Sequence, residues 1–128
     1  MKILKSAVIA FSLATAIGSF STAALAESDP GRISYKPIDV INGIKDRIAA
    51  AETAINNGGD EAEVVGLIKK ASDFTKELNA NDKVARETDK VRKHLKAAVA
   101  SAKSANMQEA KEHLNAAKET TDGLKKLL

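Results

Sequence analysis

Apolar residues recur at alternating steps of three and four along most of this chain, and this spacing is typical of amphipathic helices. It predicts four helical segments, and no strand pattern competes with them. The first two stripes are Ile41, Ile44, Ile48, Ala51 and Ile55, then Val64, Ile68, Ala71, Thr75 and Leu78. The third is Val84, Thr88, Val91, Leu95, Ala98, Ala102 and Ala105, and the fourth is Ala110, Leu114, Ala117, Thr121, Leu124 and Leu128.

Polar residues and glycines mark the ends of these helices. Residues 56–59 read Asn-Asn-Gly-Gly and end the first helix, and residues 79–81 separate the second from the third. Asp60 and Asn106 each have Glu three residues later, a spacing close to that of a capping box. Because such short breaks turn consecutive helices antiparallel, we expect an all-α, up-down-up-down four-helix bundle over residues 38–128. A three-helix arrangement with a long first helix is the alternative.

The two halves of the helical region resemble each other. Apolar positions in 44–54 correspond to those in 95–105 at a constant offset, and positions in 68–78 correspond to those in 114–124. We interpret this as two copies of one helical hairpin. The alternative is the similarity that any two alanine-rich hairpins show.

The first 26 residues have the features of a secretory signal peptide. Lys2 and Lys5 precede an apolar run over residues 7–20, and residues 24–26 form an Ala-Leu-Ala cleavage site. A membrane anchor is the alternative, but the run is shorter than the roughly 20 apolar residues that a spanning helix needs. We therefore expect cleavage after Ala26, a periplasmic protein, and a flexible lead-in over residues 27–37.

The composition excludes several classes of function. The chain has no Cys, which rules out disulfides, thiolate chemistry and a lipid anchor at the cleavage site. Of 20 basic side chains, Lys2 and Lys5 belong to the predicted leader, which leaves 18 against 17 acidic ones. This near-balance argues against nucleic-acid binding. No catalytic motif is visible, so we expect a protein that is not an enzyme.

Two histidines are the candidate functional residues. His94 and His113 each precede an inward leucine, and both fall at the boundary between core and solvent on one side of an antiparallel helix pair. Counting outward from the turn near Ala105 gives an axial offset of roughly 6 Å between them. Glu109 lies one turn before His113. Imidazole with carboxylate suits copper, nickel or zinc, so these three residues form a candidate divalent-metal site. Ordinary surface histidines are the alternative.

A basic strip follows the third predicted helix, with Arg86, Lys90, Lys93, Lys96 and Lys103. We interpret it as a solvated face. The alternative is contact with an anionic membrane or lipopolysaccharide. The alternative function to metal binding is a metal-independent envelope interaction or stress module that acts through its helical surfaces. Alanine-rich bundles also pair along exposed stripes, so the chain is expected to be a monomer or a homodimer.

Several of these residues resemble the small metal-binding proteins of the bacterial periplasm. They are Lys93-His94, Ala98-Val99-Ala100, Lys103 and Glu112-His113. The resemblance implies a short exported bundle of repeated, histidine-rich helical hairpins that binds copper, nickel or zinc. His94 and His113 match the family's histidines, whereas Ser101, Asn106 and Thr120 stand where that family has more, and residues 41–78 contain none. The expected metal binding is therefore weak.

The size and helix layout are also similar to those of the periplasmic four-helix-bundle b-type cytochromes. Haem in that family needs a Met and a His at the two ends of the bundle. Here Met107 lies in a turn, and the last helix has no terminal His. We expect no haem and no other organic cofactor.

Overall fold

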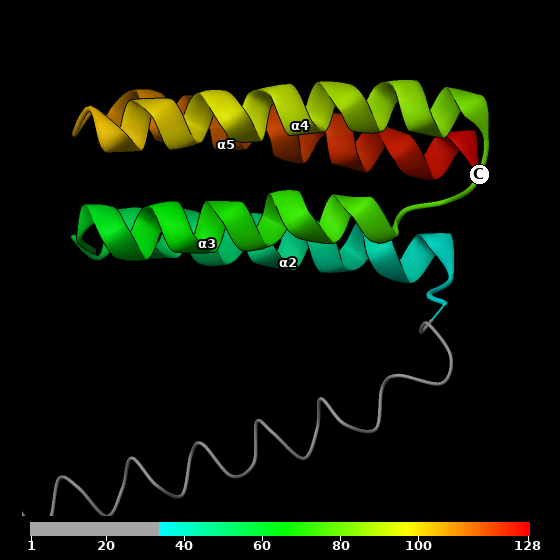
Figure 1. Cartoon of the computed structure of the whole chain (residues 1–128), viewed down its shortest axis with the longest axis horizontal. Coiled ribbons are helices and arrows are strands. Elements are labelled where there is room, and N and C mark those ends of the chain that lie inside the picture. Colours follow the sequence, from blue (N-terminus) through cyan, green and yellow to red (C-terminus); the bar gives the residue numbers. More distant parts are fainter. Residues whose placement is uncertain (1–33) are drawn as a thin grey trace, which may run out of the picture. The chain divides into compact units, whose positions relative to one another are not determined.

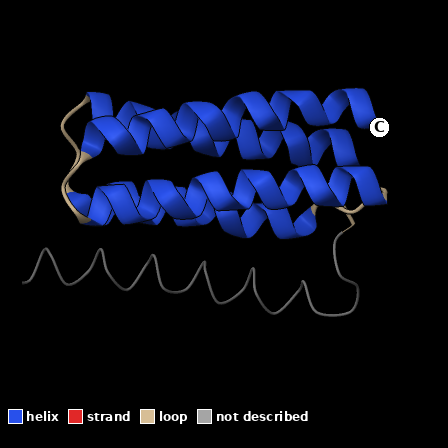
Figure 2. Ribbon diagram, turned by 90° about the horizontal axis from the view of Figure 1, so that it is seen from above, coloured by secondary structure: helices blue, strands red, loops and turns tan. Residues whose placement is uncertain are grey.

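The computed structural model describes residues 34–128. They form helices α2 (Pro37–Asn56), α3 (Glu61–Phe74), α4 (Asp82–Lys103) and α5 (Met107–Leu124), with 3-10 turns η1 (Thr75–Glu77) and η2 (Lys125–Leu127). This part of the chain contains no strand (Figure 2), so the expected all-α class is confirmed. The three-helix alternative is wrong because the chain leaves the helix between α2 and α3. The predicted signal peptide and residues 27–33 of the lead-in lie outside the described residues.

Local chemistry explains where the helices begin and end. The side chains of Asp60, Asn81 and Asn106 each accept a hydrogen bond from the backbone N–H three residues later, which satisfies one of the free donors of a helix N-terminus. Gly58 follows α2 with a φ of 74°, a conformation that glycine adopts without strain. α2 begins at Pro37, one residue before the predicted start, because the fixed φ of proline suits a first helical turn.

The four helices pack together in two side-by-side pairs. α2 lies beside α3 and α4 beside α5 (Figure 1), and further contacts join α2 to α5 and α3 to α4. Each helix therefore touches two others, and the core lies between all four. The expected packing of four helices is confirmed.

Polar side chains join α2 to α5 at three levels. The partners are Lys45 with Asp122, Glu52 with Lys118, and Asn56 with Lys111. Because the residue numbers fall on α5 as they rise on α2, these two helices run in opposite directions. The hydrogen bond from Lys45 lowers the pKa of the Asp122 carboxyl, against a smaller opposing effect of its burial. Lysine and acidic side chains therefore neutralise each other where α2 packs against α5.

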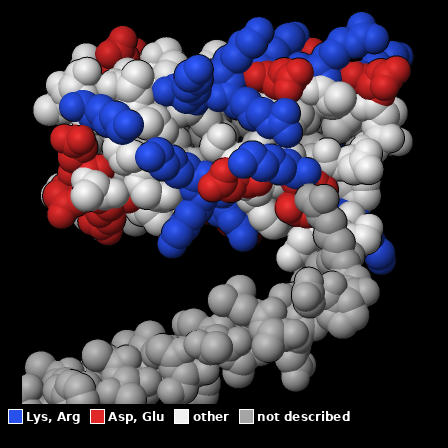
Figure 3. Space-filling view, in the orientation of Figure 1, with Lys and Arg blue, Asp and Glu red and all other residues white. Residues whose placement is uncertain are grey.

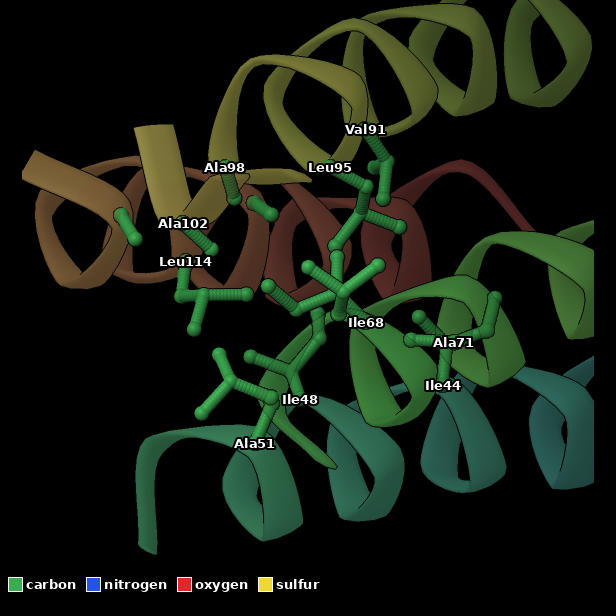
Figure 4. Packing of buried hydrophobic residues seen from close by; sticks show 14 of the residues in the cluster. Ile44, Ile48, Ala51, Ile68, Ala71, Val91, Leu95, Ala98, Ala102 and Leu114 are labelled. Carbon is green, nitrogen blue, oxygen red and sulfur yellow. The ribbon is translucent and has the colours of Figure 1, made fainter. Parts of the chain in front are cut away.

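Large aliphatic residues from all four helices meet in the core. Ile48, Ile68, Leu95 and Leu114 are fully buried and point toward one another (Figure 4). Alanine occupies many other inward positions and lets the helices approach closely. The fully buried alanines are Ala51, Ala71, Ala98, Ala102, Ala110 and Ala117.

Most of the predicted inward positions are buried, and four are not. Ile55 and Leu78 are only half-buried, at the ends of their stripes. Ala105 is exposed because α4 ends before it and the chain turns there with a φ of 60°. Leu128 follows the last turn and is 53% exposed. In each of the four predicted stripes, the last residue is therefore the one that is not buried.

Three buried threonines place hydroxyl groups inside the bundle. Thr88 and Thr121 donate hydrogen bonds to the carbonyl four residues earlier, at 2.7 Å each. Thr75 donates to the Ser72 carbonyl and accepts a hydrogen bond of 2.9 Å from Arg92 Nε. A buried hydroxyl without a partner is costly, and these hydrogen bonds remove that cost. The bond from Arg92 also links α4 to η1, which follows α3.

Candidate functional site

Contacts between α4, α5 and the residues that flank them run from the turn that joins the two helices to the far end of the pair. The backbone N–H of Asn106 donates to the Ser101 carbonyl at 2.9 Å, and Asn81 Nδ2 donates to the Leu127 carbonyl at 3.0 Å. His94 and His113 face each other between these two levels. Partner numbers again fall on one helix as they rise on the other, so α4 and α5 are antiparallel. We call this line of contacts the α4–α5 seam.

His94 and His113 lie side by side on this seam. Their ring centroids are 6.4 Å apart, with an angle of 33° between the ring planes. Both residues are half-buried, and each is followed by a fully buried leucine, Leu95 or Leu114. The buried leucines fix the backbone on which the imidazoles are carried. The structure therefore brings together the two histidines that the sequence places near each other, and metal binding by them stays a prediction.

Glu109, the third predicted ligand, has another partner in this structure. It is exposed, and its Oε2 accepts a hydrogen bond of 3.0 Å from Asn106 Nδ2. Its own backbone N–H donates to Asn106 Oδ1 at 3.3 Å, so Asn106 caps the start of α5 and its side-chain amide holds the Glu109 carboxylate. Within residues 34–128, no group of three or more His, Cys, Asp or Glu side chains is arranged to hold a metal ion.

The face formed by α3 and α4 is rich in basic side chains. Residues 64–72 and 90–106 contain no Asp or Glu, and lysine and arginine side chains gather across this face (Figure 3). The basic residues of these two segments are Lys69, Lys70, Lys90, Arg92, Lys93, Lys96 and Lys103. Lys90 and Arg92 are paired with Glu87 and Asp89. Sequence reasoning found the part of this surface on α4 and missed the part on α3, which only helix packing adds.

Comparison with known proteins identifies no relative: no family model, no curated protein and no solved structure matches the chain. None of the helices in residues 34–128 combines the length and the apolar character needed to cross a bilayer. The resemblance to periplasmic small metal-binding proteins therefore rests on a few residues of α4 and α5.

Proposed function

We propose that this protein is an exported, non-enzymatic periplasmic bundle that binds one divalent copper, nickel or zinc ion weakly through His94 and His113. The observation that supports this most directly is the 6.4 Å separation of the two imidazole rings across the α4–α5 seam. Glu109 is the proposed third ligand. Its carboxylate is exposed and held only by Asn106, so it can exchange that neutral partner for a cation.

The chemistry of this pair sets its expected behaviour. A neutral imidazole donates a lone pair to the metal, and a protonated one cannot, so binding weakens in acid. Two imidazoles suit the borderline cations copper, nickel and zinc better than calcium or magnesium. The two ligands come from different helices, so a bound ion would join α4 to α5. Binding to the folded state alone would raise the free energy of unfolding.

The proposal includes export and an up-down-up-down topology made of two similar hairpins. Export is supported by the charged start, the apolar run over residues 7–20 and the Ala-Leu-Ala site. The topology is supported by the antiparallel partners of α2 with α5 and of α4 with α5.

The metal proposal is tested by titrating the purified protein with Cu(II), Ni(II) and Zn(II) in a calorimeter at neutral pH. We expect His94→Ala with His113→Ala to weaken Cu(II) binding by tenfold or more, about 1.4 kcal/mol. Each single variant should lose less, and Glu109→Gln should lose least. Thr120→Ala, which lies on α5 seven residues after His113, is the control and should bind like the parent protein. Equal heats for the parent protein and the double variant would refute the site.

A second candidate function is contact with an anionic lipid surface through the α3–α4 face. This function is favoured by a difference between two sides of the bundle. Between α2 and α5, lysines form ion pairs with acidic residues of the other helix. Lys69, Lys96 and Lys103, in contrast, have no ion-pair partner in residues 34–128. Each lysine near an anionic membrane contributes about 1 kcal/mol.

Co-sedimentation with vesicles tests this second function. We expect binding to phosphatidylglycerol vesicles at low salt and none to phosphatidylcholine vesicles. Replacing Lys69, Lys96 and Lys103 with Gln should abolish it, since three such contacts amount to about 3 kcal/mol. Replacing Lys36, Lys111 and Lys125 with Gln removes the same charge elsewhere and should reduce binding much less. If the two triple variants lose vesicle binding equally, the lipid responds to the net charge of the protein and the α3–α4 face is not a binding surface.

A further inference from the structure

A groove lies between the first turns of α4 and the C-terminal end of α5, away from the histidine pair. It has a volume of about 640 Å³, within the range of roughly 300–1,000 Å³ that is typical of small-molecule sites. Arg86 lines it, and the rise of 1.5 Å per residue places residue 86 about 12 Å along α4 from residue 94. The groove is therefore a separate place from the proposed metal site.

One wall of the groove includes Gly123, an exposed residue of α5 that has no side chain. A Cβ atom built on Gly123 would meet no atom within 4 Å, so the space beside α5 is unfilled there. Leu127 of η2 also lines the groove and packs partly against the hydrophobic core. The aliphatic stems of Lys83, Arg86 and Lys126 add apolar surface. The groove therefore offers apolar surface from Leu127 and from these stems beside its charged groups.

The rim of the groove is positively charged. Lys83, Arg86 and Lys126 have no ion-pair partner within the described part of the chain. Of the two acidic residues on the rim, Glu87 is paired with Lys90 at 2.6 Å. Glu119, the other acidic residue of the rim, has no ion-pair partner within residues 34–128. The groove is therefore lined by three basic side chains and one acidic side chain without ion-pair partners. This excess of positive charge favours a ligand with an anionic headgroup.

We infer that this groove binds a fatty-acid carboxylate. The hydrocarbon chain lies along Gly123 and Leu127, and the carboxylate meets the ammonium and guanidinium groups on the rim. The apolar surface of Leu127 and of the basic side-chain stems favours a ligand with a tail, and the cations distinguish an anionic amphiphile from a neutral or cationic one. This function is independent of the proposed metal binding.

The test compares three amphiphiles with tails of the same length, each below its micelle concentration. Decanoate, decyltrimethylammonium and decyl maltoside are titrated into the purified protein and followed by calorimetry and by amide chemical shifts. Decanoate should bind at least tenfold more tightly than the other two, with shifts confined to residues 83–87 and 119–127. Equal affinity for decyltrimethylammonium would overturn the inference.

Two glycines provide matched variants of the groove. Gly123→Leu fills the space and should weaken decanoate binding tenfold or more. Gly66 is also a helical glycine whose added Cβ would meet no atom within 4 Å, but it lies on α3, so Gly66→Leu should bind decanoate like the parent protein. Undiminished binding by Gly123→Leu, or an equal loss in both variants, would place the ligand elsewhere.

Charge variants test the rim separately. Arg86→Gln and Lys126→Gln should each weaken decanoate binding, whereas Glu119→Gln should strengthen it, because it removes the opposing charge. Loss of binding in Glu119→Gln would contradict the assignment. The double variant His94→Ala with His113→Ala should bind decanoate as the parent protein does, so failure of the metal site and failure of the groove give different results.

Discussion

Gly43→Ala is expected to destabilise the bundle, whereas the same change at Gly66 or Gly123 is expected to stabilise it. All three glycines lie inside helices, where alanine is favoured by roughly 0.5–1 kcal/mol. A Cβ on Gly66 or Gly123 would meet no atom within 4 Å, but a Cβ on Gly43 would overlap Cε1 of Phe74. Overpacking of this kind costs about 1–3 kcal/mol, so the clash outweighs the helical preference at Gly43 alone.

The Phe74 ring cannot move away from Gly43 without losing other contacts. The edge-to-face partner of the ring is Tyr35, at 5.6 Å between centroids, and the Arg47 guanidinium carbon lies 3.7 Å from the ring centroid. Arg47 also donates a hydrogen bond of 2.9 Å to the Gly43 carbonyl. An exposed cation–π contact contributes roughly 0.5–1 kcal/mol. Moving the ring would therefore also weaken the contact of α3 with the start of α2.

Urea unfolding of the three alanine variants measures this difference, and a Phe74→Ala background shows its cause. Once the ring is removed, Gly43→Ala should stabilise the protein as Gly66→Ala does. If Gly43→Ala stabilises the protein with Phe74 in place, the close approach of the ring to α2 is wrong.

Leu114→Ala is expected to cost about 2–5 kcal/mol of unfolding free energy, the range for a leucine truncated in a close-packed core. Leu114 is 0% exposed, and Figure 4 shows it among buried residues of the other helices, with Ile48 on one side and Ala102 on the other. The alanines around it cannot fill the space, because their side chains end at Cβ. A small domain is stable by only about 5–15 kcal/mol in total, so this one change removes a large share.

The neighbouring residue supplies the control for this prediction. Asn115 is exposed on the same turn of α5, and Asn115→Ala should change stability by less than about 0.5 kcal/mol. Chemical denaturation followed by circular dichroism measures both variants. A loss below 1 kcal/mol for Leu114→Ala would mean that the core between α4, α5 and α2 is less well packed than the structure indicates.

The sequence predicts the helices and their inward faces because both follow from residue spacing along one segment. It also predicts that His94 and His113 lie near each other, since the short turn before α5 fixes the register of α4 against α5. It does not predict that Phe74 packs on Gly43, because spacing within one helix carries no information on which residue of another helix faces it. The groove is missed for a related reason: it depends on the absence of a side chain at Gly123 and on where η2 places Leu127.

The opposite directions of α2 and α5 have a consequence for chain connectivity. Lys45 meets Asp122 near one end of the bundle and Asn56 meets Lys111 near the other, so Pro37 and Leu124 lie at the same end. A short linker could join these two positions, and new termini could be opened at Gly58, in the turn between α2 and α3. Such a circular permutant would keep the packing of α2, α3, α4 and α5 and change the order in which the helices are synthesised.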